Sequence, residues 1–463
     1  MPSMKPSERK STSYADTDWK ARAIGVGSCV LVFLSLTYPT VPRLVYLKAA
    51  LFGALLLIIV LEHFTNGRSR LDSRVMLWTL CLAIVGIFFV MEGVLTGAAG
   101  ATAVSTVYIL WPLTFGVLIA GFARKHILVG LDRTLIVATL FIGVYGCVYL
   151  LAGLGILPNN GFVSALSLGW EYEAFGAHEG YTQFEIAGMN SLPFLLPYVM
   201  ASIAIRTPTD RKRRLRDAFL WLASIFGCAI ILTGARRALT LVMILTPGLV
   251  LFLRCFQPET EKRLNRRSLV RLFVLVAIGM VVLFVGVSTI YEFNLSSLWD
   301  RFTAGFDIGA QATEENEMAR HEQLVALWRG WMEHPLLGWG HGAGTHFSVR
   351  SDAMPWAYEL SYLALLFQTG IVGFTAYLAG VIWIFREGIK VIREGGQLGR
   401  FMLPMLAGFS GLLIANATNP YLLKFDGMWM FFLPLAVINY RLVMSGAKSW
   451  SSYQNQPSLS FNR

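Results

Sequence analysis

The sequence contains little charge. Of its 463 residues, only 14% are Asp, Glu, Lys or Arg, and 55% are hydrophobic, whereas soluble domains carry about 25% charged residues. This composition excludes a soluble domain and a disordered chain. Lys and Arg outnumber Asp and Glu, 39 to 28, but they are scattered over short segments between apolar runs. We therefore expect them to set membrane topology and to contact membrane lipids, with no nucleic acid as partner.

The sequence also lacks a pattern of metal ligands. Its five cysteines lie in or at the ends of apolar runs without metal-ligand spacing, and the histidines at 321, 334, 341 and 346 do not form a zinc-type motif. We expect no metal site and no disulfide in the longer polar segments.

Apolar runs of about 20 residues recur along the whole chain, as helices that cross a ~30 Å hydrocarbon core require. Continuous apolar runs indicate helices and not the alternating strands of a barrel. The sequence therefore predicts an all-α, polytopic integral membrane protein, a single membrane domain over residues 1–463. The twelve expected spans are 23–40, 44–63, 75–93, 104–123, 134–156, 191–206, 217–234, 238–255, 270–291, 359–385, 401–419 and 428–444.

The distribution of Lys and Arg predicts the orientation of these spans. Most of the cations, including those of the run 211–216, fall in alternate connections and in the N-terminal segment. By the positive-inside rule, both termini then lie in the cytoplasm. The same rule places two longer connections, 157–190 and 292–357, on the outer side.

These two outer connections are the segments most favourable for chemistry. Segment 292–357 is rich in Trp, Gly and His, and loops of this length are commonly functional. Segment 157–190 combines aromatic residues with carboxylates, which suits sugar rings and equally suits an interfacial aromatic belt.

Arg236 and Arg237 stand in the short outer connection between the seventh and eighth spans. Cations there oppose the topological bias, and ionisable residues at membrane depth are costly and usually functional. The planar fork of arginine matches phosphate oxygens, so the pair is a candidate site for the pyrophosphate of a lipid-linked substrate. The alternative is that both side chains extend to headgroup phosphates.

The region from 320 to 362 holds the other candidates. Apolar residues at helical spacing over 320–333 predict an amphipathic helix against the membrane, ended by Pro335 and the glycines that follow. Arg320 would begin this helix. Glu359 opens the next span, where a carboxylate either complements the helix dipole or acts as a general base.

These residues resemble the superfamily of O-antigen polymerases and O-antigen ligases, bacterial membrane glycosyltransferases. The resemblance lies in an arginine at the end of a middle span (Ala235–Ala238), in an arginine fifteen residues before Pro335 within His334-Pro335-Leu336-Leu337-Gly338, and in Tyr362-Leu363 followed by Gly370-Ile371-Val372-Gly373. About twelve spans with a large late outer loop also fit this superfamily.

The resemblance implies a metal-independent enzyme in the bacterial inner membrane, with its site facing the periplasm and no cofactor. Its donor would be an undecaprenyl-pyrophosphate-linked glycan, and a chain-length regulator and a flippase are implied partners. Glu359 and Arg320 would be catalytic, and Arg236 and Arg237 would bind pyrophosphate. Sugar or acceptor would contact Tyr362, His334 and Arg301.

One position departs from the ligase pattern. Glu359 stands where ligase-like members usually have histidine, and this favours a polymerase of O-antigen or exopolysaccharide over a ligase that transfers finished polymer to lipid A-core. A transporter of lipid-linked sugars is a third possibility, but it would predict several ionisable residues in the middle of the spans, where this sequence has few. A non-catalytic membrane scaffold is the remaining interpretation.

Overall fold

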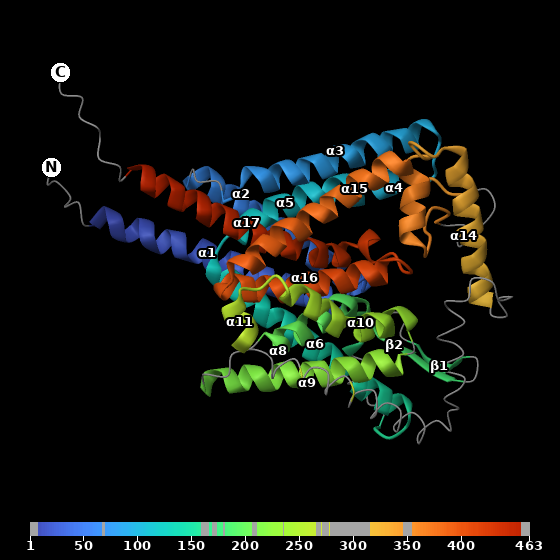
Figure 1. The fold of residues 1–463 in the computed structure, drawn as a ribbon, viewed down its shortest axis with the longest axis horizontal. Helices are drawn as coiled ribbons and strands as arrows, with labels where there is room; N and C mark the ends of the chain where they lie inside the picture. The colour runs from blue at the N-terminus through green and yellow to red at the C-terminus, as the bar shows by residue number, and fades with distance from the viewer. Residues whose placement is uncertain are drawn as a thin grey trace.

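We describe the protein from a computed structural model, drawn in Figure 1. The residues that the structure describes are 8–66, 70–158, 166–168, 174–178, 181–205, 211–234, 236–264, 270, 277, 315–345 and 354–454. Statements on contacts below concern these residues.

The described chain is a bundle of long helices. Their order is α1 (Glu8–Thr37), α2 (Pro42–Asn66), α3 (Ser73–Leu95), α4 (Ala101–Ser105), η1 (Thr106–Leu110), α5 (Trp111–Gly121), α6 (Lys125–Gly153), β1 (Ala174–His178), β2 (Tyr181–Glu185), η2 (Ala187–Ser191), α8 (Leu192–Ala204), α9 (Arg211–Thr233), α10 (Arg237–Arg254), α11 (Glu259–Leu264), α14 (Glu315–Glu333), α15 (Ser361–Glu394), α16 (Gly396–Asn416), η3 (Tyr421–Leu423) and α17 (Phe425–Gln454).

Eleven helical segments in the described ranges are long and apolar enough to cross a membrane. They correspond one by one to eleven of the twelve spans expected from the sequence, and they confirm an all-α, multi-pass membrane protein. The twelfth expected span, 270–291, lies almost entirely outside the described residues. The one antiparallel hairpin, β1–β2, comes from the outer connection 157–190.

One informative difference from the expected boundaries concerns α15. The apolar run predicted an end near 385, whereas the helix continues to Glu394. Its last turns are charged and still packed: Glu387 is 5% exposed and pairs with Lys390 at 2.5 Å and with Arg441 of α17 at 3.4 Å. Ion pairs with Lys390 and Arg441 stabilise these charged turns, and a hydropathy pattern cannot predict such pairs.

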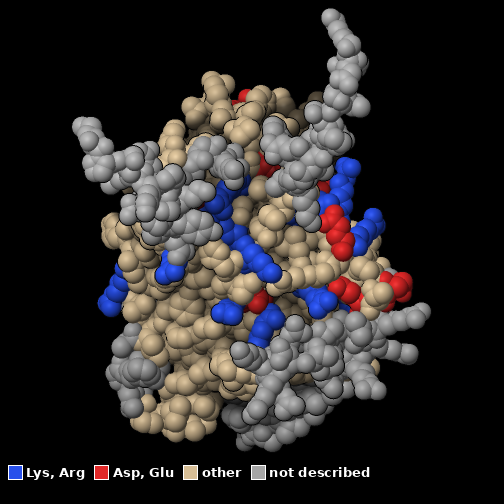
Figure 2. All heavy atoms as spheres, turned by 90° about the vertical axis from the view of Figure 1, so that its left-hand side faces the viewer, with Lys and Arg blue, Asp and Glu red and all other residues tan. Residues whose placement is uncertain are grey.

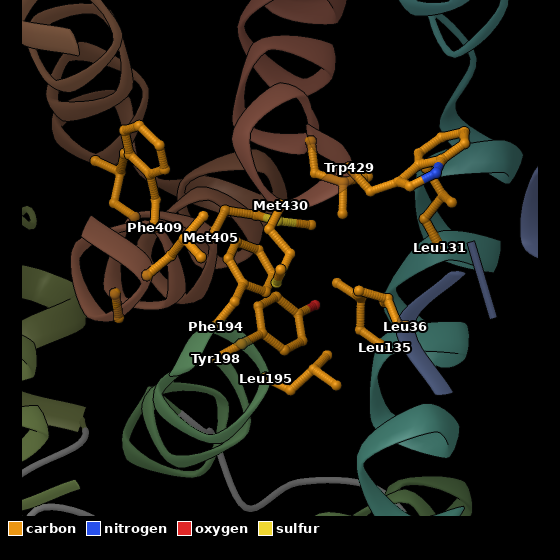
Figure 3. Close-up of a cluster of buried hydrophobic side chains, with 14 of the residues drawn as sticks. Leu36, Leu131, Leu135, Phe194, Leu195, Tyr198, Met405, Phe409, Trp429 and Met430 are labelled. Carbon is orange, nitrogen blue, oxygen red and sulfur yellow. The ribbon is translucent and has the colours of Figure 1, made fainter. Parts of the chain in front are cut away.

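The core of the bundle surrounds α8, whose residues are all buried. A helix that is apolar on every side belongs in the centre of a fold. Figure 3 shows Phe194 and Tyr198 of α8 among Met405 and Phe409 of α16 and Trp429 of α17. Two glycines of α16 permit this close packing, since a Cβ at Gly411 would lie 2.3 Å from the Pro193 carbonyl oxygen and one at Gly408 would lie 2.7 Å from that of Phe194.

The two ends of the bundle differ. Helix α1 begins and α17 ends at the left in Figure 1, whereas α14 and the β1–β2 hairpin lie at the opposite end. Figure 2 looks onto the left-hand end, where Lys and Arg side chains gather with fewer acidic ones. The connections 157–190 and 292–357 therefore contribute structure to the same end of the molecule, away from the start of α1 and the end of α17.

Candidate functional site

Helix α14 lies across the ends of the spans and packs against α15 (Figure 1). The face against the protein carries Gln323, Ala326, Leu327 and Gly330, all buried, at helical spacing. Gly330 meets the ring of Phe367, where a Cβ would lie 2.6 Å away. The outer face exposes Leu324, Trp328 and Met332. An apolar face turned outward on a helix that crosses the span ends is typical of a helix in the membrane interface.

The first turns of α14 bring Arg320 and Glu359 together. Nε of Arg320 donates to Oε2 of Glu359 at 2.6 Å, and the backbone N–H of Glu359 donates to Oε1 of Gln323 at 3.1 Å. The side chains remain 39% and 17% exposed. The two residues expected from the resemblance to be catalytic, 39 positions apart, thus form a single ion pair that is partly exposed to solvent.

Tyr362 stands three residues after Glu359, in the first turn of α15, and connects α15 to α16. Its hydroxyl donates to the backbone oxygen of Leu413 at 2.5 Å. The contact joins the chain just after Glu359 to the last turns of α16. The hydroxyl therefore has an anchoring function within the protein.

The other two residues expected to contact sugar have different positions. His334 follows α14, is exposed, and its ring packs edge-on against Trp339 with centroids 4.1 Å apart. Arg301 lies outside the described residues.

Arg236 lies at the N-terminal end of α10 and makes a second arginine–carboxylate pair at this end of the molecule. Its guanidinium pairs with Glu185, the last residue of β2, and Nη1 donates to Oδ1 of Asn190 in η2 at 2.9 Å. The Arg236 and Glu185 side chains are 21% and 25% exposed. Arg237, the first residue of α10, is half-buried. Arg236 therefore joins α10 to the connection 157–190.

A tyrosine that sequence reasoning missed completes this cluster. Tyr421, in the short turn η3, is 5% exposed, and its hydroxyl has no hydrogen-bond partner of good geometry among the described residues. A buried hydroxyl left in this way costs about 1–3 kcal/mol. Burial raises the pKa of the Tyr421 hydroxyl, and the nearby Arg236 guanidinium partly offsets this effect. Arg236 thus lies within reach of a hydroxyl oxygen whose own proton has no acceptor among the described residues.

The two ion pairs are connected through the end of α16. Tyr362 contacts Leu413, and Asn416 at the end of the same helix accepts through Oδ1 from the N–H of Leu422 in η3 at 3.1 Å. Tyr421, the preceding residue, faces Arg236. Arg320 and Glu359 on one side and Arg236 on the other therefore flank one short stretch of chain.

A second feature missed from the sequence is the insertion of the glycine-rich segment 335–345 into a break in α15. At Gly370, with φ 57° and ψ −170°, the helix is interrupted. The N–H groups of Trp339 and Gly340 donate to the carbonyls of Phe367 and Gln368, and Ile371 and Val372 donate to those of Pro335 and Leu336. The helical bonds from 371 to 367 and from 372 to 368 are replaced by four bonds to the inserted segment.

Beyond the exposed residues 335–337, this inserted segment is largely buried between three spans. Gly370 lies about 14 Å along α15 from its first residue, and irregular backbone at such depth requires protein around it. His341 is fully buried, stacks on Tyr108 with centroids 3.5 Å apart, and shares a hydrogen bond of 2.8 Å with Tyr377. Its backbone N–H donates to Phe89 of α3 at 2.7 Å. The polar Gln368-Thr369-Gly370 inside an apolar run was the available signal of this break.

Fold and site together define a multi-pass membrane protein with two arginine–carboxylate pairs at one end. Within the described ranges, no three His, Cys, Asp or Glu side chains group as ligands of a metal would. No protein-family model matches the sequence, and no curated protein matches it.

Proposed function

We propose that this chain is a polysaccharide polymerase of a bacterial inner membrane. In this proposal it transfers a glycan from polyprenyl pyrophosphate to the sugar of a second lipid-linked repeat unit at the periplasmic face. The observation that carries the proposal is that two arginine–carboxylate pairs, Arg320–Glu359 and Arg236–Glu185, are linked by contacts through the end of α16 and the turn η3. The resemblance of 233–238 and 320–373 to the O-antigen superfamily supplies the substrate class.

The chemistry assigned to these residues is a displacement at the anomeric carbon. The oxygen of the acceptor hydroxyl forms a bond to C1 of the donor sugar, and the bond from C1 to the pyrophosphate oxygen breaks. Glu359 takes the proton of the acceptor hydroxyl. The electron pair leaves on the pyrophosphate, whose growing charge Arg236 stabilises through its guanidinium. Arg320 holds the Glu359 carboxylate in place through its 2.6 Å contact.

The test is the polymer made by cells that carry single variants at normal membrane abundance. Glu359→Gln should lower the rate of transfer by about 10²–10⁴-fold, the usual contribution of a general base, and Arg236→Ala should shorten or abolish the chains. Arg329→Ala is the matched control, because Arg329 is exposed on the same helix α14.

Gel patterns of the surface polysaccharide distinguish the two members of the superfamily. Loss of a polymerase leaves lipid A-core with a single repeat unit, whereas loss of a ligase leaves bare core. Full-length chains from both Glu359→Gln and Arg236→Ala would refute the proposal, and bare core would assign the chain to the ligases.

A further inference from the structure

The buried hydroxyl of Tyr421 is the one feature beside Arg236 that the interactions within the protein leave unexplained. Its phenol ring belongs to the apolar core. The hydroxyl oxygen lies within reach of the Arg236 guanidinium, but among the described residues no group accepts the hydroxyl proton. Buried polar groups are almost always satisfied, so an exception of this kind calls for a cause. A ligand oxygen that arrives beside the hydroxyl would be such a cause.

The surroundings of the hydroxyl specify the charge of that ligand. The nearest ionised group described is the Arg236 guanidinium, whose other contacts are the carboxylate of Glu185 and the amide oxygen of Asn190. A cation and a hydroxyl donor side by side favour an anion with several acceptor oxygens. Phosphate offers such oxygens.

The position of Glu185 explains how Arg236 is kept neutralised without a ligand. Glu185 ends β2, outside the spans, and it and Arg236 are 25% and 21% exposed. An ion pair that water reaches contributes little to stability and exchanges partners readily. Asn190, by contrast, holds the guanidinium through its amide oxygen and can keep this bond while the partner anion changes.

We propose that Arg236 and Tyr421 together bind a phosphate group of the lipid-linked donor, and that Glu185 is the resident counter-ion which this phosphate displaces. Tyr421 would donate its hydroxyl proton to one phosphate oxygen, while Arg236 binds a second. The inference rests on the proposed function for the identity of the donor, and it adds a binding residue and a competing carboxylate that neither the motifs nor the resemblance contain.

The experiment measures binding of farnesyl pyrophosphate to the full-length protein in phosphatidylcholine nanodiscs. Tyr421→Phe removes only the hydroxyl and should weaken binding about 10- to 100-fold, as expected for a hydrogen bond to a charged group, while the melting temperature stays equal or rises. Glu185→Gln should bind several-fold more tightly, because the competing charge is gone. Farnesol should not bind to any variant.

Tyr377→Phe is the matched control, since it also removes one buried tyrosine hydroxyl, here the one bonded to His341. It should lower the melting temperature and leave the affinity for farnesyl pyrophosphate unchanged. A second arm adds phosphatidylglycerol to the nanodiscs. If this lipid competes with farnesyl pyrophosphate in proportion to its concentration and as strongly, the site is a headgroup site and the inference is wrong.

The remaining outcomes separate this inference from the function on which it rests. If Arg236→Lys weakens binding but Tyr421→Phe does not, the role of Tyr421 is refuted while the pyrophosphate site of the polymerase survives. If neither variant changes the affinity, the assignment of Arg236 to pyrophosphate fails as well.

Discussion

Two buried polar clusters at the outer-loop end of the bundle differ in whether their hydrogen bonds are complete. In the first, Lys48 of α2 donates to Asp426 at 2.9 Å and to the carbonyl of Tyr38 at 2.7 Å, and Asp426 accepts from the N–H of Thr40 at 2.8 Å. In the second, Arg236 pairs with a partly exposed Glu185 beside the unmade bond of Tyr421.

The difference indicates what each cluster does. The ends of α1, α2 and α17 meet at Lys48 and Asp426, whose side chains are 4% and 7% exposed, so this pair joins the three helix ends and is shielded from solvent. The Arg236–Glu185 pair is partly exposed, so another anion can replace Glu185 as the partner of Arg236. We therefore expect the Lys48–Asp426 cluster, whose hydrogen bonds are all made within the protein, to govern stability. We expect the Arg236 cluster to govern binding and transfer.

The strongest test of this comparison is Asp426→Ala. It leaves the buried ammonium of Lys48 without its partner, and breaking such a pair costs about 3–5 kcal/mol. Unfolding by SDS in mixed micelles should show this loss. The double variant Lys48→Met/Asp426→Leu should recover most of it, because no uncompensated charge remains. Wild-type stability of Asp426→Ala would remove the basis for calling the cluster structural.

Gly370→Ala tests the inserted segment, whose backbone bonds are also complete. The added Cβ would lie 2.2 Å from the Leu336 carbonyl oxygen, and the glycine conformation at φ 57° and ψ −170° by itself costs other residues about 1–3 kcal/mol. We expect a loss of about 3 kcal/mol in the same unfolding assay. Gly446→Ala, where a Cβ meets no neighbour within 4 Å, is the control, and equal stabilities for the two variants would contradict the prediction.

Tyr377→Phe should have a smaller effect. The Nε2 atom of His341 loses its 2.8 Å partner in a fully buried place, which costs about 1–3 kcal/mol. The free energy of unfolding should fall by this amount while polymer length in cells stays normal at equal abundance. Shortened polymer would mean that the inserted segment contributes to transfer.

Glu185→Gln should have the smallest effect on stability. Because the pair with Arg236 is partly exposed, its loss should change the free energy of unfolding by about 0–1 kcal/mol. Asp426→Ala also removes the acidic partner of a cation, so the experiment compares the losses in free energy of unfolding of the two variants. A loss of 3 kcal/mol or more would place the Arg236 cluster with the structural ones.

The sequence predicts the spans well because lipid requires each crossing segment to satisfy its own backbone within a continuous apolar run. Arg236 and Glu359 are also noticeable in the sequence as ionisable residues at span ends, whereas Arg320 is named through the resemblance, by its place fifteen residues before Pro335. The sequence does not show which residues they pair with. Arg320 and Glu359 are 39 positions apart, and Glu185 and Arg236 are 51 positions apart, so only the packing of the folded chain brings them together.

Tyr421 and His341 were missed for a different reason. An aromatic residue after a span resembles an interfacial anchor, and a histidine among glycines resembles part of an exposed turn. Only the packed structure shows that the first keeps a hydroxyl without a partner and that the second is enclosed by Tyr108, Gln368 and Tyr377.

The insertion of segment 335–345 into α15 has a consequence for how the chain assembles during synthesis. The backbone groups of segment 335–345 and of α15 that hydrogen-bond to one another are separated by fewer than forty residues. The segment also contacts α3 and the α4–η1 region, which precede it in the chain and are therefore synthesised earlier. Contacts this close in sequence form with little loss of chain entropy. The outer half of α15 can thus be completed before α16 and α17 leave the ribosome, so the carboxylate of Glu359 is already held when the helices that bring Tyr421 towards Arg236 arrive.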